Sequence, residues 1–190
     1  MKLMIDLETL GTSNKAHVLS LGVAFFDDEK IHHSSHLLIK PDGQEGRERS
    51  YSTFMWWLKQ ASENPAAAKG IMEGERLHID RALSVLTDMI NTHRPKEVWA
   101  NSPTFDCAIL RDLYEQSPIM ETPWPFWAER DFRTLKAVTG GIVPAFEGVQ
   151  HNAEVDAIYQ AKCVIHLLNG QRYMEKVFRE VMPGAVEVRQ

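Results

Sequence analysis

Two acidic residues, Asp6 and Glu8, stand two positions apart in the apolar stretch that opens the chain at residues 2–9. Successive side chains of a β-strand point to opposite faces, so both carboxylates would project from one face while Ile5 and Leu7 pack from the other. Like charges about 7 Å apart in a poorly solvated strand repel each other, and Mg²⁺ or Mn²⁺ is a common counter-charge. A half-exposed strand whose acids simply face water is the commoner explanation for such a pair taken alone.

Three residues later in the chain have the chemistry to complete a metal site: Asp106, His151 and Asp156. Asp106 follows a predicted buried strand at residues 97–101, at the end where an open α/β sheet binds its ligands, although acids also favour the first turn of a helix. His151 and Asp156 are five residues apart, so on one helix they would lie about 140° apart and could not face one centre. We therefore predict that His151 lies in a loop, as a movable general base, ahead of the helix that fixes Asp156.

Three strands in succession, at residues 2–9, 17–26 and 31–39, are predicted to carry the first acidic pair. Their short connections imply an antiparallel meander. Two more strands are predicted at residues 97–101 and 128–132, each followed by a helical segment, which is the pattern of parallel strands with crossover helices. The sequence therefore predicts an α/β fold with a mixed central sheet, in which the meander and the parallel strands are flanked by helices.

Apolar residues at helical spacing predict the helices at residues 51–61, 79–93, 134–138, 152–168 and 173–181. A further helix is predicted after residues 97–101, with Ser102 as its N-cap and Pro103 at its first position. Asn152 is predicted to cap the long helix, which small residues would allow to approach the sheet closely, namely Ala153, Ala157 and Ala161. The last helix is predicted to end at Pro183-Gly184.

The composition describes an ordinary globular chain of 190 residues, 44% of them hydrophobic and 25% charged, so we expect a single domain over residues 1–190. Cys107 and Cys163 fall in predicted helices without zinc-like spacing, which favours a reducing compartment. We expect a cytoplasmic protein without a membrane partner, because the N-terminus is not a signal peptide and no apolar run is long enough to span a bilayer. A net charge of -5 argues against a broad basic surface for duplex DNA, but not against nucleic acid as a substrate.

Two clusters have the residue types of a binding site without its geometry. His33 would lie on the opposite face of its strand from His32 and His36, and no fourth ligand is near, so we expect these histidines to face solvent rather than a metal. Arg47 and Arg49 lie in a predicted loop at residues 41–50, and we expect them to be solvated rather than bound to phosphate.

Trp56 and Trp57 are adjacent in the predicted helix at residues 51–61. Neighbouring residues cannot share one helix face, so one tryptophan is predicted to enter the core. The other is predicted to line a cleft or a partner surface.

Three segments of the sequence resemble the three motifs of the DEDDh branch of 3'-to-5' exonucleases, within the ribonuclease H-like superfamily. They are DLETLG at residues 6–11, NSPTFD at residues 101–106 and HNAEVD at residues 151–156. Their order and the spacing of His151 and Asp156 match that family. The short chain and the paired tryptophans are most similar to small phage and bacterial exonucleases related to ribonuclease T and to a mycobacterial exoribonuclease.

The resemblance implies a metal-dependent enzyme that releases nucleoside 5'-monophosphates from the 3' end of single-stranded RNA or DNA. Two ions, Mg²⁺ or Mn²⁺, would be bound, with Asp6 bridging them. Glu8 and Asp156 would complete the site of the ion that activates water, Asp106 would bind the second ion, and His151 would be the general base. The resemblance also implies a homodimer.

The same resemblance implies substrate contacts at Thr9, Leu10 and Gly11, whose backbone would meet the terminal nucleotide while Leu10 packs on a base. Phe105 would stack on a base, although core packing explains its position equally well. Many relatives have Thr where Leu10 stands, and no residue marks a contact to the 2'-hydroxyl, so the choice between RNA and DNA stays open. The alternative is a nucleotide- or nucleic-acid-binding module with a non-catalytic exonuclease-like fold, which the four intact acidic positions oppose.

Overall fold

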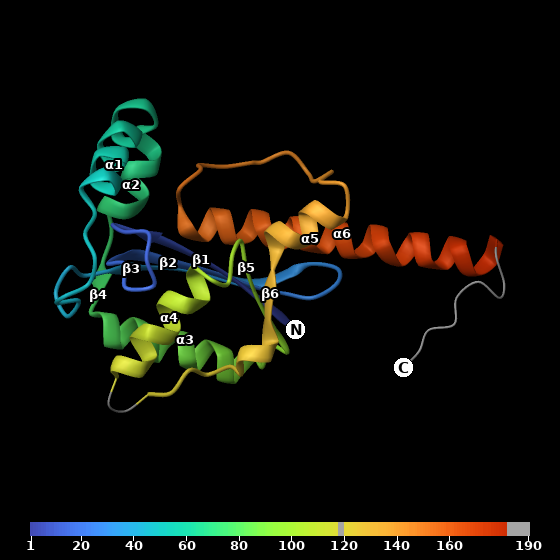
Figure 1. Cartoon of the computed structure of the whole chain (residues 1–190), viewed down its shortest axis with the longest axis horizontal. Coiled ribbons are helices and arrows are strands. Elements are labelled where there is room, and N and C mark those ends of the chain that lie inside the picture. Colours follow the sequence, from blue (N-terminus) through green and yellow to red (C-terminus); the bar gives the residue numbers. More distant parts are fainter. Residues whose placement is uncertain (118–119, 182–190) are drawn as a thin grey trace.

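Six strands form one mixed sheet in the computed structural model, which describes residues 1–117 and 120–181 (Figure 1). They are β1 (Lys2–Thr9), β2 (Val18–Phe26), β3 (Ile31–Ile39), β4 (Arg76–Leu77), β5 (Glu97–Ala100) and β6 (Glu129–Asp131), in the spatial order β4-β3-β2-β1-β5-β6. β1, β2 and β3 form the predicted antiparallel meander, whereas β5 runs parallel to β1 and β6 runs parallel to β5. The predicted mixed sheet flanked by helices is confirmed.

Helices cover both faces of this sheet. They are α1 (Tyr51–Glu63), α2 (Pro65–Met72), α3 (Ile79–His93), α4 (Asp106–Gln116), α5 (Phe132–Val138) and α6 (Ala153–Val181), with a short 3-10 turn at Phe126–Ala128. α3 and α4 pack on one face, α5 and α6 lie over the other, and α1 and α2 stand together beside the N-terminal end of α6 (Figure 1). No helix within the described ranges combines the length and apolar character that a membrane crossing requires.

β1 divides its side chains between two hydrophobic cores. Ile5 and Leu7 pack with α3 and α4, whereas Met4 packs on the opposite face with α6. Asp6 and Glu8 follow Met4 on the α6 side, because alternate strand residues share a face. Apolar packing on that face therefore stops where the two acids begin.

The N-terminus of α6 lies directly on β2. A Cβ atom on Gly22 would come within 2.0 Å of the Ala153 carbonyl, so only glycine allows this approach. Ala153, Ala157 and Ala161 are fully buried, as their predicted contact with the sheet requires. The backbone N–H of Val155 donates to Asn152 Oδ1 at 3.2 Å, which confirms the predicted N-cap.

The predicted start of the helix after β5, with Ser102 as its N-cap, is wrong. α4 begins at Asp106, and Ser102 does not cap it. The backbone N–H groups of Phe105 and Asp106 both donate to the Ser102 carbonyl, at 2.8 and 3.2 Å, so residues 102–105 form a turn instead. The Ser102 hydroxyl is hydrogen-bonded to Thr104 and cannot serve as a cap.

The predicted break near Gly170 is also wrong, because α6 continues from Ala153 to Val181 and contains the stretch expected to be a separate helix. A glycine inside a helix costs only about 1 kcal/mol relative to alanine, which is too little to end a helix this long. Pro183 and Gly184 lie outside the described residues.

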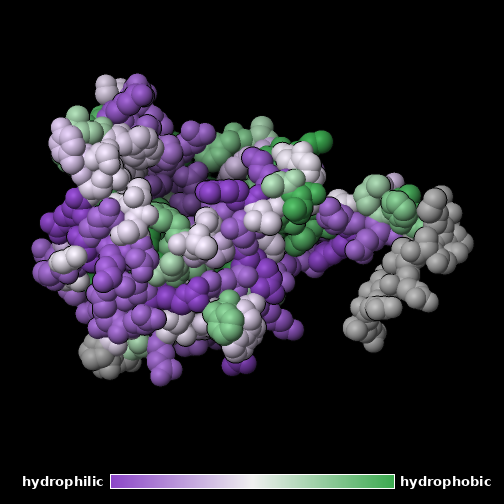
Figure 2. Space-filling view, viewed as in Figure 1, coloured by the Kyte–Doolittle hydropathy of each residue, from purple (hydrophilic) through white to green (hydrophobic). Residues whose placement is uncertain are grey.

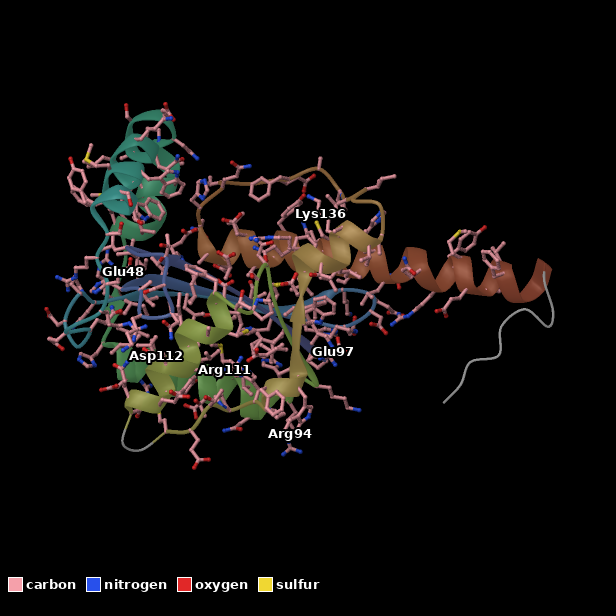
Figure 3. All side chains as sticks on the ribbon, viewed as in Figure 1. Glu48, Arg94, Glu97, Arg111, Asp112 and Lys136 are labelled. Carbon is pink, nitrogen blue, oxygen red and sulfur yellow. The ribbon has the colours of Figure 1, made fainter. Side chains whose placement is uncertain are left out.

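Arg47 is buried rather than solvated, which corrects a third expectation. Its guanidinium donates to the carbonyls of Ala16 and Asn14 and binds the Asp112 carboxylate at 2.7 Å. Figure 3 labels Asp112 on α4. These contacts fix the loop after β3 against α4, so Arg47 has a structural role. α2 and β4 are elements that the sequence patterns did not predict.

Candidate active site

A cleft of about 490 Å³ opens beside the acidic end of β1, between α4, α5 and the first turns of α6. All five residues predicted to form the catalytic and metal site line this cleft: Asp6, Glu8, Asp106, His151 and Asp156. They come from three elements and one loop that are remote in sequence. The structure therefore brings the three motif segments together in space.

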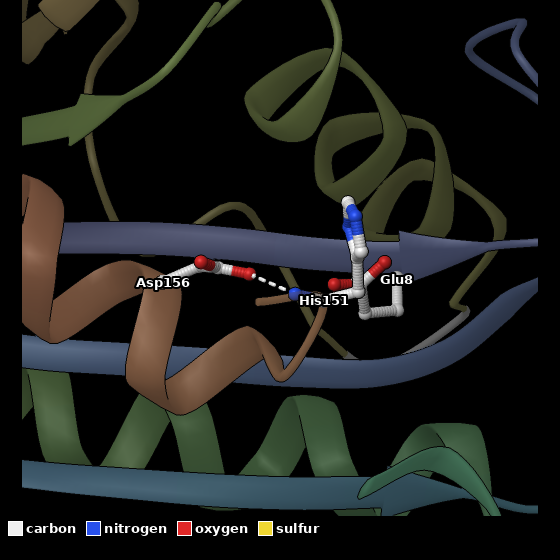
Figure 4. A group of neighbouring side chains, drawn as sticks. All are labelled: Glu8, His151 and Asp156. Atoms are coloured by element: carbon white, nitrogen blue, oxygen red, sulfur yellow. Dashed lines mark hydrogen bonds between the residues drawn. The ribbon is translucent and has the colours of Figure 1, made fainter. Parts of the chain in front are cut away.

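Short contacts tie these segments to one another. One ligand atom from each of Glu8, His151 and Asp156 lies within 4.8 Å of the others (Figure 4). The backbone N–H of His151 donates to Asp156 Oδ2 at 2.8 Å, which fixes the end of the loop to α6. The backbone N–H of Leu7 donates to Asp106 Oδ1 at 3.1 Å, which fixes α4 to β1.

Burial raises the pKa of the carboxyl groups in this cleft. Burial, and then the charges of Asp106, Glu8 and Asp156, hold the pKa of Asp6 well above its ordinary value. Burial and the neighbouring charges of Asp156 and Asp106 raise the pKa of Glu8 to about 8. The pKa of Asp106 is raised to about 7 by burial, which the hydrogen bond from Leu7 only partly opposes, and burial raises that of Asp156 as well. The site therefore favours positive charge among its carboxylates.

The donor set suits a hard divalent cation, because it consists of four carboxyl groups that are buried or half-buried in one place. Gln160 adds a further observation. Its Nε2 donates to Asp6 Oδ1 at 2.7 Å, whereas its Oε1 is buried and has no hydrogen-bond partner in the described part of the chain. An amide oxygen left without a partner beside buried carboxylates is consistent with a bound cation or its water.

His151 has a left-handed backbone conformation, with φ at 63°, which is uncommon for a residue with a side chain. It precedes α6, as predicted from its spacing to Asp156. Trp57 is buried and donates from Nε1 to the Thr9 carbonyl at 2.9 Å, while Trp56 is 39% exposed and packs against the His151 ring. Trp57 belongs to the core, as predicted for one of the pair, and Trp56 lines a cleft, as predicted for the other, although Trp57 also forms part of the wall of that cleft.

A second cleft of about 360 Å³ lies beside the first, between the end of β1 and α1. Thr9 and Gly11 line this cleft, and Phe105 lines both clefts. Leu10 lines neither cleft. Its backbone N–H donates a hydrogen bond to the His17 carbonyl, and its carbonyl accepts one from the Ser50 N–H. The predicted substrate contacts therefore lie at the junction of two clefts, with Leu10 set back from them.

Residues that the motif patterns missed also line the main cleft: Arg133, Phe146, Tyr159 and Gln160. Gln160 stands four positions after Asp156, so helical spacing could have placed it on the same face of α6. Arg133 follows the end of β6, where α/β sheets commonly bind ligands. No local signal marks Phe146, whose place depends on the fold of the loop before α6. His32 and His33 are exposed, as expected, whereas the expectation is wrong for His36, which is half-buried with an Nε2 that has no hydrogen-bond partner in the described residues.

Comparisons with known proteins agree with this geometry. A family model described as the 3'-5' exoribonuclease Rv2179c-like domain matches residues 1–168. An exodeoxyribonuclease of Enterobacteria phage T4 is 29% identical, over 69% of this chain and 68% of the phage protein.

Two solved structures share the fold. The nuclease domain of 3'hExo, a DEDDh family member bound to rAMP, aligns with a TM-score of 0.59 at 12% identity, over 89% of this chain and 92% of that one. Exonuclease X in complex with 5' overhanging duplex DNA aligns with a TM-score of 0.52 at 17% identity, over 93% of each chain. Because the family model spans most of the sequence, this protein belongs to the Rv2179c-like family of 3'-5' exoribonuclease domains and is a 3'-to-5' exonuclease.

Proposed function

We propose that this exonuclease hydrolyses the terminal phosphodiester at the 3' end of single-stranded RNA or DNA and uses two divalent cations, Mg²⁺ or Mn²⁺. The convergence of four carboxyl groups and one imidazole in a single cleft carries the proposal. Asp6 would hold both ions, Glu8 and Asp156 would complete one site, and Asp106 would complete the other. When bound, such ions generate a nucleophile from water and stabilise charge on the attacking and leaving oxygens.

His151 would act as the general base that takes the proton from the attacking water. Imidazole is the side chain that most readily exchanges a proton near neutral pH, and general-base groups typically contribute about two to four powers of ten in rate. The contact of its backbone with Asp156 supports this role, because it holds the base next to a metal ligand. The products are a nucleoside 5'-monophosphate and a strand shortened by one nucleotide.

The substrate strand would enter through the two adjoining clefts. The backbone from Thr9 to Gly11, including that of Leu10, would meet the terminal nucleotide. The expected packing of Leu10 on a base is not carried into this proposal, because Leu10 lines neither cleft. Phe105 would contact a base at the junction of the clefts, and Arg133 would bind a phosphate, since its exposed side chain lines the main cleft. The family description names an exoribonuclease and the phage relative is an exodeoxyribonuclease, so both RNA and DNA are proposed as substrates.

A labelled-strand assay tests the reaction. RNA and DNA of one sequence, each labelled at the 5' end, are incubated with Mg²⁺ or Mn²⁺ and then with a chelator. We expect shortening from the 3' end that the chelator and Asp6→Asn abolish. His151→Ala should lower turnover by about two to four powers of ten while metal affinity survives. Asp88→Asn, an exposed carboxyl on α3, is the control that should change nothing.

Two outcomes would contradict the proposal. Binding of the strand without metal and without shortening would indicate a binding module. Equal loss of metal affinity in His151→Ala would show that His151 is a ligand rather than the base.

We also propose that residues 1–190 form one exonuclease domain that acts as a homodimer. Large apolar side chains support self-association, since Tyr173, Met174 and Phe178 are 67%, 53% and 50% exposed. They lie on the part of α6 that projects beyond the sheet, where Figure 2 shows hydrophobic side chains. Sedimentation equilibrium at micromolar concentration should give twice the mass of one chain.

A further inference from the structure

The adjacent tryptophans on α1 connect two parts of the site that are remote in sequence. Trp57 is buried and its Nε1 donates to the Thr9 carbonyl at 2.9 Å, so it is fixed to the end of the strand that carries Asp6 and Glu8. The Trp56 ring packs against Trp57 in a T-shaped contact with centroids 5.0 Å apart. α1 is thus attached to the end of β1 by one hydrogen bond from Trp57, and Trp56 packs on Trp57 within the helix.

The imidazole of His151 packs against these two indole rings. Its centroid lies 4.8 Å from that of Trp56 with the rings at 86°, and 6.3 Å from that of Trp57 with the rings at 82°. Within the described residues, His151 forms a hydrogen bond through its backbone N–H and none through its ring. A catalytic imidazole is usually oriented by a hydrogen bond to its second nitrogen, whereas here the contacts that can orient the ring are its packing against Trp56 and Trp57.

The backbone around His151 makes such support necessary. The residue has a left-handed φ of 63°, and Gly148, three positions before it, has a φ of 120°. Neither residue belongs to a helix or strand, so the backbone alone does not fix the orientation of the His151 side chain. Trp56 can supply that direction, because an indole has only two side-chain torsions and its partner Trp57 is buried.

We propose that Trp56 is a positioning residue for the proposed general base, holding the His151 imidazole toward the attacking water through ring packing that Trp57 anchors to β1. The proposal rests on the general-base role of His151 stated above. It assigns to α1 a part in the chemistry although the helix carries no acidic or basic residue of the site. It also explains why two tryptophans stand side by side, since each has a different task.

A second role for Trp56 must be separated from this one. Trp56 is 39% exposed and lines the 360 Å³ cleft, so a substrate base could stack on it directly. A residue that acts through His151 loses its effect when His151 is absent. A residue that binds the substrate keeps its effect whether or not His151 is present.

A double-mutant cycle on single-turnover rates therefore tests the proposal, with the full chain, saturating RNA and Mg²⁺. We expect Trp56→Ala to lower the rate by roughly tenfold to a hundredfold, because a small misplacement of a catalytic group has that cost. The same change in a His151→Ala background should lower the rate by less than about twofold, as expected for residues that act as one unit. Trp56→Phe, which keeps a rigid ring, should recover most of the rate.

Phe54→Ala is the matched control, because Phe54 is an exposed aromatic residue on the same helix that makes no ring contact with His151 in the described residues. It should leave the rate unchanged. Retained circular dichroism and metal binding in Trp56→Ala would show that the fold and the carboxylates are intact.

Equal rate losses for Trp56→Ala in both backgrounds would overturn the proposal, as would a rise in KM with no loss of the saturated rate. Either result would assign Trp56 to base binding. A fully active His151→Ala variant would instead refute the general-base assignment, and the positioning role with it.

Discussion

Buried carboxyl groups give the metal-free protein an unusual dependence on pH. The pKa of Glu8 is raised to about 8 and that of Asp106 to about 7, mainly by burial. In the unfolded chain both groups lose their protons near their ordinary values, so the folded state binds more protons than the unfolded state between those values and about pH 8. Stability therefore falls as pH rises through this window.

We predict that the melting temperature of the metal-free protein falls between pH 6.5 and pH 9, and that Glu8→Gln flattens this dependence. A loss of even about 1 kcal/mol corresponds to roughly 2–4 °C for a domain of this size. His17, whose pKa is lowered to about 4 by burial and by Arg49 and Arg47, acts in the opposite sense, mainly between pH 4 and its ordinary value of 6.5. A series of thermal melts in chelator, repeated with Mg²⁺, measures the effect.

Added Mg²⁺ should remove most of the fall, because it supplies the counter-charge that the carboxylates lack. If the melting temperatures of the original protein and of Glu8→Gln fall by the same amount from pH 6.5 to pH 9, the burial argument for Glu8 is contradicted.

At the scale of elements, the contact between β2 and α6 decides where Asp156 and His151 lie. A Cβ on Gly22 would come within 2.0 Å of the Ala153 carbonyl, so Gly22→Ala must push the first turn of α6 away from the sheet. We predict that this change costs about 1–3 kcal/mol in the free energy of unfolding and lowers turnover, because overpacking has that size. Urea denaturation and the strand-shortening assay measure the two effects.

Gly170→Ala is the matched control, because Gly170 lies on α6, the helix that Gly22 contacts. Nothing lies within 4 Å of a Cβ at Gly170, and the position is helical, so alanine should raise stability by about 0.5–1 kcal/mol without changing turnover. Equal effects of the two glycine substitutions would refute the close contact at Gly22.

The same elements show what could be predicted from the sequence. The alternating and helical patterns that are strong over eight or more residues, such as Ile31–Ile39 and Ile79–His93, were sufficient to give the observed bounds. The start of α4 and the continuity of α6 were not predictable from local signals, because a backbone turn overrode the Ser102 cap and the helix continued through Gly170. Two-residue β4 has no pattern of its own and depends on pairing with β3.

For the site, residue type and spacing placed His151 in its loop ahead of α6. They could not show that Trp56 meets His151, that Gln160 bonds Asp6, or that Arg133 enters the cleft. Those contacts depend on how α1, α5 and α6 are arranged around the end of β1, and that arrangement is set by tertiary packing.

The charge of the whole molecule limits how it can bind a polyanion. The net charge is -5, and the cleft itself contains four carboxyl groups. Arg47 and Arg111 are bound to Asp112 and Glu129, whereas Arg133 lines the cleft and forms no ion pair with any described residue. Electrostatic attraction to the nucleic-acid substrate should therefore depend on the proposed metal ions and on very few side-chain cations.

We predict that Arg133→Gln raises KM about tenfold at moderate salt with little change in kcat, and lowers the slope of log KM against log salt by about 0.7, the value for one phosphate contact to a single strand. Arg130→Gln is the control, because Arg130 is also exposed but its guanidinium donates to the carbonyls of Trp127 and Glu129. Steady-state assays at fixed Mg²⁺ and several KCl concentrations measure both quantities. The same slope and KM in Arg133→Gln as in Arg130→Gln would show that Arg133 does not contact phosphate, and the strand would then be held by the metal ions and the bases alone.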